Sequence, residues 1–133
     1  MKNTDKEDFE ILKKLLKNSY SPYSNFRVGV VLYTVKNKIF KGVNIENSSF
    51  SLTICAERAA LFNAITNGYR TFKKLLLIND TKNIIVPCGS CLQVLSEFCD
   101  KEFPIFSYNI DGDYNRYLLK DLLPNSFNFN KKN

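Results

Sequence analysis

Histidine is absent from this 133-residue chain. Because imidazole is the commonest metal ligand among protein side chains, a metal site in this chain has to rely on other groups. The sequence offers sulfur instead, in four cysteines at positions 55, 88, 91 and 99. An all-sulfur site is therefore the economical expectation for a bound zinc ion.

Long hydrophobic runs are also missing. Leu75–Ile78, one of the longest, has the length of a strand and is far short of the roughly 20 residues that span a bilayer. The first ten residues, MKNTDKEDFE, bring acidic side chains at once, and no apolar signal region follows. We therefore expect a cytoplasmic protein with no membrane segment, in which thiols stay reduced and disulfides are not favoured.

No internal repeat, Gly/Ser-rich linker or low-complexity block divides the chain. Hydrophobic residues make up 44% and charged residues 24% of the sequence, a balance typical of globular chains and not of disordered ones. The length fits one compact core. We expect residues 1–133 to form a single domain.

The net charge of +6 raises the question of a nucleic-acid partner. The positive residues are mostly lysines spread along the chain, and no arginine-rich arm or RNA-binding signature accompanies them. This pattern favours a lysine-covered solvent face and no nucleic-acid partner. An RNA- or DNA-binding or editing protein is the alternative that the charge leaves open.

Hydrophobic periodicity and turn residues predict alternating strands and helices. Helices are expected over residues 5–18, over 54–67, after Pro87 and over 117–123, strands over 27–34, 39–44, 74–79 and 104–107, and a turn over 111–115. Two hairpin strands followed by helix–strand–helix–strand indicate an α/β protein with a mixed sheet and helices packed on its faces.

Three of the cysteines fall at predicted helix starts. Cys55 begins one helix, and Cys88 and Cys91 begin the next. Residues three apart share a helix face, so Cys88 and Cys91 can bind one ion together, and helix N-termini stabilise thiolates over thiols. Adjacent right-handed crossovers bring both helix starts to the same edge of the sheet. Cys55 is therefore expected to approach the other two.

The Cys-x-x-Cys spacing alone is compatible with a redox pair, a structural zinc site or a catalytic one. A fourth thiolate from Cys99 would close a structural site. That residue lies deep in the helix after Cys91, where we expect a buried apolar thiol. Three thiolates from Cys55, Cys88 and Cys91 leave one tetrahedral position open, which is the pattern of a catalytic zinc site.

Two residues beside Cys55 complete the candidate site. Zinc lowers the pKa of a bound water to about 7, and Glu57, in the same helical turn as Cys55, can take and deliver protons there. Three thiolates make the metal electron-rich, and Arg58 is placed to donate hydrogen bonds to the sulfurs. The alternative for Glu57 is an ordinary acidic residue at a helix N-terminus.

The order Cys55-Ala-Glu and Pro87-Cys-Gly-Ser-Cys91 is that of zinc deaminases in their three-cysteine form. Together with SPYSNFRVG, GVNIENSSF and LLPNSF, it makes nearly the whole chain resemble the small, homotetrameric cytidine deaminases of pyrimidine salvage. The resemblance implies a three-layer α/β/α fold with a mixed central sheet and helices on both faces. It also implies one Zn²⁺ per subunit, with Glu57 as proton shuttle in the hydrolysis of cytidine and 2′-deoxycytidine to the uridine nucleosides and ammonia.

The resemblance assigns further roles. Asn44 and Glu46 match the pair that hydrogen-bonds the sugar 3′-hydroxyl, and Phe26 matches the aromatic residue that packs against the pyrimidine. The backbone of Ala56 would contact the polar edge of the base. Phe127 matches a phenylalanine that completes the pocket of a neighbouring subunit.

Three positions depart from the family pattern. Leu92 stands where arginine is common, Val30-Val31 where small residues are common, and Phe50 where tyrosine is common. One rival is an enzyme of the same fold that acts on another aminopyrimidine, such as blasticidin S, although Glu46 favours a ribose-reading site. A second rival is a non-catalytic protein in which zinc has only a structural role.

Overall fold

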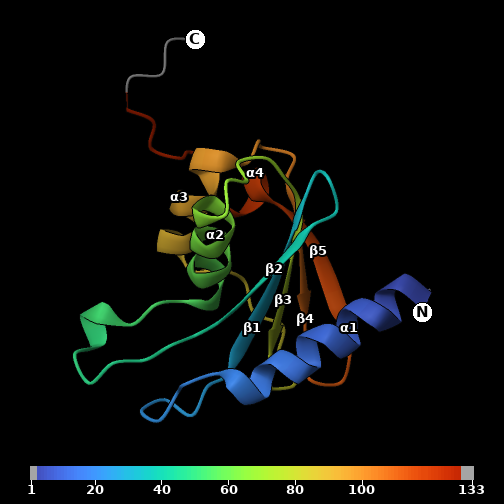
Figure 1. The fold of residues 1–133 in the computed structure, drawn as a ribbon, viewed down its shortest axis with the longest axis vertical. Helices are drawn as coiled ribbons and strands as arrows, with labels where there is room; N and C mark the ends of the chain where they lie inside the picture. Colours follow the sequence, from blue (N-terminus) through green and yellow to red (C-terminus); the bar gives the residue numbers. More distant parts are fainter. Residues whose placement is uncertain (1–2, 130–133) are drawn as a thin grey trace.

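The chain folds as one sheet flanked by helices (Figure 1). The computed structural model describes residues 3–129. Its elements are, in order, α1 (Asn3–Leu15), the 3-10 helix η1 (Leu16–Asn18), β1 (Val28–Thr34), β2 (Ile39–Val43), the 3-10 helix η2 (Phe50–Leu52), α2 (Ala56–Thr66), β3 (Phe72–Asn79), α3 (Gly89–Phe98), β4 (Pro104–Tyr108), β5 (Tyr114–Leu118) and α4 (Leu119–Leu122). Within residues 3–129, no helix is both long enough and apolar enough to cross a membrane.

The sheet is mixed, with the strand order β2-β1-β3-β4-β5. β1 runs antiparallel to both β2 and β3, β4 runs parallel to β3, and β5 runs antiparallel to β4. β2, β3 and β4 therefore point in the same direction. Parallel strands need long crossover connections, and α2 and α3 supply them.

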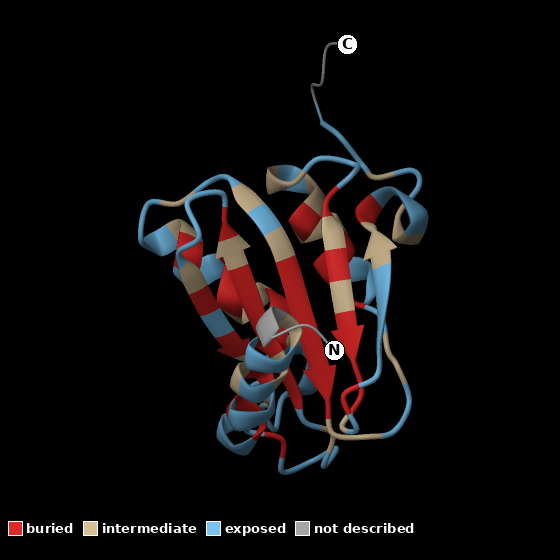
Figure 2. Cartoon of the chain, turned by 90° about the vertical axis from the view of Figure 1, so that its right-hand side faces the viewer, coloured by how far each residue is buried: buried red, intermediate tan, exposed pale blue. Residues whose placement is uncertain are grey.

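Two hydrophobic cores lie on opposite faces of the sheet. Alternate residues of β1 serve the two faces, as the two-residue period of a strand requires: Val31 packs toward α1, and Val30 and Leu32 pack toward α2. Figure 2 shows buried residues along the central strands and mostly exposed residues on the outer surface of α1, which lies in front of them. This arrangement confirms the predicted α/β fold with a mixed sheet and helices on both faces.

The starts of α2 and α3 lie at one edge of the sheet. α2 follows β2 and α3 follows β3, and these two strands are parallel, so both helices begin beyond the same strand ends. The loops over residues 19–27 and 44–55 gather at this edge, where Ile45 forms bridges to Tyr20 and Ile54. Figure 1 shows both loops projecting beyond the sheet at the lower left.

The C-terminal part differs from the sequence prediction. The sequence predicts a turn over residues 111–115 and a helix over 117–123. The structure has the turn at residues 110–112, then the strand β5, and only the single-turn helix α4. The reason is pairing across the sheet. β5 lies against β4 with Tyr114 opposite Tyr108, and the two rings lie 4.9 Å apart. Cross-strand aromatic pairs stabilise a strand that the local sequence does not favour.

Candidate active site and metal centre

Three cysteine sulfurs meet where α2 and α3 begin. Cys55 is the N-cap of α2, Cys88 is the N-cap of α3, and Cys91 lies in the first turn of α3. The Sγ of Cys88 is 4.0 Å from that of Cys55 and 3.5 Å from that of Cys91, and all three lie within 4.8 Å of one another. Tetrahedral zinc with bonds of about 2.3 Å holds its sulfurs about 3.8 Å apart. The donor set therefore fits a zinc ion with one position left for another ligand.

A single guanidinium group accompanies the sulfurs. Nη2 of Arg58 donates to the Sγ of Cys55 over 3.4 Å, and Nε of Arg58 is buried without a hydrogen-bond partner among the described residues. The pKa of the Cys55 thiol is lowered to about 5. The main cause is the nearby Cys91 thiol, and the hydrogen bond from Arg58 is the second cause that lowers it. The same contact with Cys55 raises the pKa of Arg58. Arg58 thus offsets part of the negative charge that the thiolates carry.

The carboxyl group of Glu57 is buried beside the cysteines. Glu57 is the second residue of α2 and is only 5% exposed. Burial raises its pKa to about 7, and the charge of Cys55 adds to the rise. A carboxyl group with this pKa can both give and take a proton near neutral pH.

A pocket of about 220 Å³ opens at these groups. Six of the residues predicted from the sequence line it: Phe26, Asn44, Cys55, Ala56, Glu57 and Cys88. Apolar side chains from the segment before α3, Ile85 and Val86, line it too. Mostly apolar walls with a few converging polar groups are typical of sites for small organic ligands.

The backbone of α2 comes close to the sheet at this pocket because of Gly42. A Cβ atom at Gly42 would lie 2.4 Å from the carbonyl oxygen of Ala56 and 2.5 Å from the backbone nitrogen of Ala60. The sequence alone does not single out this glycine, because only the packing of α2 on β2 excludes a side chain at position 42.

The side chain of Asn44 is held by hydrogen bonds to the loop before β1 and to the first residue of β1. Its Oδ1 accepts hydrogen bonds from the backbone N–H of Val28, at 3.0 Å, and from the hydroxyl of Ser19. Its Nδ2 donates to the carbonyl oxygen of Phe26 over 2.7 Å. Since an amide oxygen accepts two hydrogen bonds and an amide nitrogen donates two, one N–H of Asn44 remains for a ligand.

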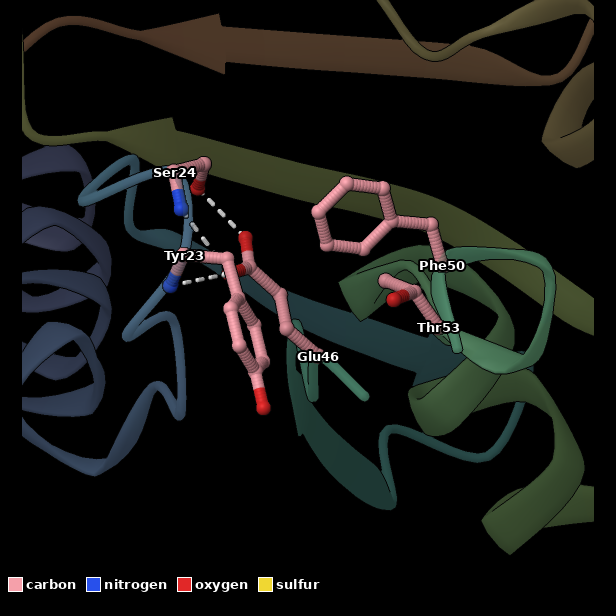
Figure 3. Close-up of a pocket in the computed structure, with 5 residues that line it drawn as sticks. All are labelled: Tyr23, Ser24, Glu46, Phe50 and Thr53. Atoms are coloured by element: carbon pink, nitrogen blue, oxygen red, sulfur yellow. Dashed lines mark hydrogen bonds between the residues drawn. The ribbon is translucent and has the colours of Figure 1, made fainter. Parts of the chain in front are cut away.

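Glu46 lies in a neighbouring pocket of about 400 Å³, lined by Tyr23, Ser24, Glu46, Phe50 and Thr53 (Figure 3). Thr53 also lines the first pocket, so the two pockets lie next to each other. The Oε1 of Glu46 accepts the backbone N–H groups of Tyr23 and Ser24, each over 3.1 Å, and its Oε2 accepts the hydroxyl of Ser24. Asn44 and Glu46 are two residues apart in an extended segment and so project to the same side.

Phe127 lines neither pocket, and its side chain is 70% exposed. Its backbone is nevertheless fixed. The side chain of Gln93 accepts the Phe127 N–H at 3.0 Å and donates to the Phe127 carbonyl oxygen at 2.9 Å. The structure therefore ties the C-terminal segment to α3 and leaves the phenyl ring free on the surface.

Cys99 stands apart from the other cysteines. It is the C-cap of the ten-residue helix α3 and so lies at the helix end and not within it, about 16 Å along the helix from Cys88. Burial raises the pKa of the Cys99 thiol to about 12. Leu92 is 4% exposed and packs in the core under α2, so among the described residues only Arg58 is a cation hydrogen-bonded to a cysteine sulfur.

The chain is similar to known proteins over most of its length. The sequence model described as the cytidine and deoxycytidylate deaminase zinc-binding region matches residues 2–107. A cytidine deaminase of Sporosarcina psychrophila is 44% identical over 115 residues, which cover 86% of this chain and 85% of the relative. A cytidine deaminase of Halalkalibacterium halodurans is 40% identical over 109 residues, covering 82% and 83%.

A solved structure shares the fold. The crystal structure of cytidine deaminase from Burkholderia pseudomallei matches with a TM-score of 0.87 and 39% identity, over 96% of this chain and 100% of that one. The cytidine deaminase of Mycobacterium tuberculosis matches with a TM-score of 0.77 and 30% identity, over 92% and 98%. The chain therefore belongs to the cytidine and deoxycytidylate deaminase family.

Proposed function

We propose that this chain catalyses the hydrolytic deamination of cytidine and 2′-deoxycytidine to uridine and 2′-deoxyuridine, with release of ammonia. One observation carries the proposal: the three-sulfur cluster, the buried carboxyl group of Glu57 and the ring of Phe26 meet at a single pocket. Similarity to relatives named cytidine deaminase, at 44% and 40% identity, supports the same reaction.

Cys55, Cys88 and Cys91 would hold one zinc ion per chain. Zinc in such a site supplies an activated water at neutral pH. The role of Arg58 is to donate to the sulfur of Cys55 and so limit the negative charge at the metal.

Glu57 moves the protons of the reaction. Hydrolysis forms a C4–O bond and breaks the C4–N4 bond, so the attacking water has to lose a proton and the departing ammonia has to gain one. The carboxylate of Glu57 accepts one proton of the attacking water and passes it to ring N3. It then takes the remaining proton from the oxygen now bonded to C4 and delivers it to the amino nitrogen, which leaves as ammonia. Burial of Glu57 keeps bulk solvent from competing for these protons.

The remaining polar groups suit a sugar hydroxyl. Asn44 keeps one N–H free, and Oε2 of Glu46 keeps one acceptor direction beside the Ser24 hydroxyl. A hydroxyl that accepts from Asn44 and donates to Glu46 satisfies both. We assign this hydroxyl to the 3′ position of the nucleoside, with the base against Phe26 and its polar edge at the backbone of Ala56.

The charge at the pockets favours a nucleoside over a nucleotide. Glu46 and Glu57 contribute carboxyl groups, and among the described residues no lysine or arginine lines either pocket. A phosphate group placed there would meet carboxylates without the cations that usually bind it.

We further propose that the enzyme acts in pyrimidine salvage, in the cytoplasm, as a homotetramer. The exposed ring of Phe127 supports a contribution to the pocket of a neighbouring chain. Tyr23 and Phe50, which line the pocket around Glu46, are also exposed, at 47% and 71%. Burial of such rings between subunits would stabilise an assembly.

The test is to incubate the purified protein with cytidine, 2′-deoxycytidine, 2′-deoxycytidine 5′-monophosphate and blasticidin S, and to follow the change in ultraviolet absorbance on deamination. The proposal expects conversion of the two nucleosides and little or no conversion of the other two. Protein that contains zinc and leaves both nucleosides unchanged would rule the proposal out. Sedimentation of the same sample gives the number of chains in the assembly.

A further inference from the structure

The turn before β1 contains a serine whose hydroxyl joins two of the residues assigned to the substrate. Ser24 donates its O–H to Oε2 of Glu46 and accepts the backbone N–H of Phe26 at 3.0 Å. A serine hydroxyl has one proton, and since the Phe26 N–H is already the donor to its oxygen, that proton goes to Glu46. The result is a directed chain of hydrogen bonds from the Phe26 backbone through Ser24 to the Glu46 carboxylate. Figure 3 shows the hydroxyl of Ser24 pointing at this carboxylate.

The other contacts of the carboxylate determine what is left for a ligand. Oε1 of Glu46 receives two backbone N–H groups, from Tyr23 and Ser24. A carboxylate has about four acceptor directions, two on each oxygen. Oε1 is therefore filled, and Oε2 has a single direction open, next to the hydroxyl of Ser24. A ligand hydroxyl that donates to Glu46 has to do so at Oε2.

The local backbone brings Ser24 to this position. Asn25 adopts a positive φ of 56°, which asparagine tolerates better than most residues, and its N–H donates to the carbonyl oxygen of Ser21 at 3.0 Å. The turn therefore points both the N–H of Ser24 and its hydroxyl toward Glu46. The hydrogen bond from Ser24 is also the largest cause that lowers the pKa of Glu46, so the carboxylate stays ionised as an acceptor.

We propose that Ser24 is a positioning residue for sugar recognition, whose hydroxyl fixes Oε2 of Glu46 to meet the nucleoside 3′-hydroxyl and couples that carboxylate to the segment that carries Phe26. This inference rests on the proposed nucleoside substrate. Ser24 itself does not touch the reacting atoms. Its loss should weaken the reading of the 3′-hydroxyl and leave proton transfer at Glu57 intact.

The test compares two substrates that differ only in the 3′-hydroxyl, 2′-deoxycytidine and 2′,3′-dideoxycytidine. In Ser24→Ala, kcat/KM for 2′-deoxycytidine should fall about tenfold, mostly through KM, because a charge-assisted hydrogen bond is lost from the carboxylate. For 2′,3′-dideoxycytidine, measured as a substrate or as a competitive inhibitor, the change should be less than about twofold, since the affected contact is not made.

Two further variants separate the hydroxyl from the fold. Ser24→Thr keeps a hydroxyl at an exposed position and should retain wild-type constants within about twofold. Ser96→Ala is the matched control, because among the described residues the Ser96 hydroxyl bonds only the carbonyl oxygen of Gln93 in α3. It should leave kcat/KM for both substrates unchanged. Equal losses for both substrates in Ser24→Ala, no loss for 2′-deoxycytidine, or a threonine variant as impaired as the alanine one would each overturn the inference. Wild-type protein that fails to convert 2′-deoxycytidine overturns the proposed function instead.

Discussion

Gly42 and Ala56 are in contact through their backbones, with room for only a hydrogen atom on the Cα of Gly42. A Cβ atom there would lie 2.4 Å from the carbonyl oxygen of Ala56, well inside van der Waals contact. Ala56 is the first residue of α2, between Cys55 and Glu57. The position of the metal and proton-transfer groups therefore depends on a glycine in the neighbouring strand.

Gly42→Ala is expected to destabilise the protein by about 3 kcal/mol, because the backbone of α2 has to move away from β2 to relieve the overlap. Chemical denaturation measures this change. In protein that still folds, zinc content should also fall, since Cys55 moves with the helix. The matched control is Gly89→Ala, where the added Cβ meets no atom within 4 Å and stability should stay the same or rise. Equal stability of Gly42→Ala and the wild type would contradict the close packing.

The proximity of the side chains at the candidate site can be predicted from the sequence because the spacing that produces it is local. Cys55 and Glu57 share one helical turn, Cys88 and Cys91 share another, and the crossover rule brings the two turns together. What the sequence does not reveal depends on contacts between distant segments. Gly42 is needed only because α2 packs on β2, and the bond from Ser24 to Glu46 spans 22 residues.

The same distinction applies to the fold. The strands β1 and β3 are predicted because continuous apolar residues mark strands buried on both faces. β5 is exposed along most of its length and carries no such pattern. Its pairing with β4, and not its own composition, makes it a strand. The prediction missed this strand, placed the turn of residues 110–112 too far along the chain, and made the terminal helix longer than Leu119–Leu122.

The bonds between Gln93 and the backbone of Phe127 can be tested by hydrogen exchange. In Gln93→Ala, the amide of residue 127 loses its acceptor and should exchange much faster. In Phe127→Ala the same amide keeps its acceptor and should stay protected, while deaminase activity falls and zinc content is retained. An unchanged exchange rate in Gln93→Ala would show that the C-terminal segment is held by other contacts.

Zinc content tests which cysteines bind the metal. Cys91→Ser replaces one of three clustered sulfurs, and zinc should fall well below one per chain because a hydroxyl is a poor zinc ligand at neutral pH. Cys99→Ser should retain the zinc of the wild type. Metal analysis of dialysed protein distinguishes the two. Loss of zinc in Cys99→Ser would instead support the alternative of a closed structural site with four thiolates.

Cys99 should also make stability decline at high pH. Burial raises its pKa from 9.0 to about 12, so above pH 9 the unfolded chain releases this proton while the folded protein keeps it. The free energy of unfolding then falls as the pH rises from about 9 toward 12. At pH 10, one unit above the ordinary pKa of the thiol, the loss in free energy of unfolding is about 1.4 kcal/mol.

Urea denaturation of wild type and Cys99→Ala at pH 8 and pH 10 isolates that contribution. Between pH 8 and pH 10, the free energy of unfolding should fall less in Cys99→Ala than in the wild type. Packing lost in the variant lowers its stability equally at both pH values and so does not affect this comparison. Parallel losses in the two proteins would mean that Cys99 titrates normally in the folded state.

The most direct test of the central claim is the turnover of cytidine by Glu57→Gln, with zinc measured in the same sample. Glutamine keeps the size and polarity of the buried side chain and removes its ability to carry a proton. Turnover should fall by at least about a thousandfold, the scale of a lost acid–base group, while zinc stays near one per chain. A variant that holds zinc and still deaminates cytidine at a rate close to that of the wild type would contradict the assignment of Glu57 as the proton shuttle.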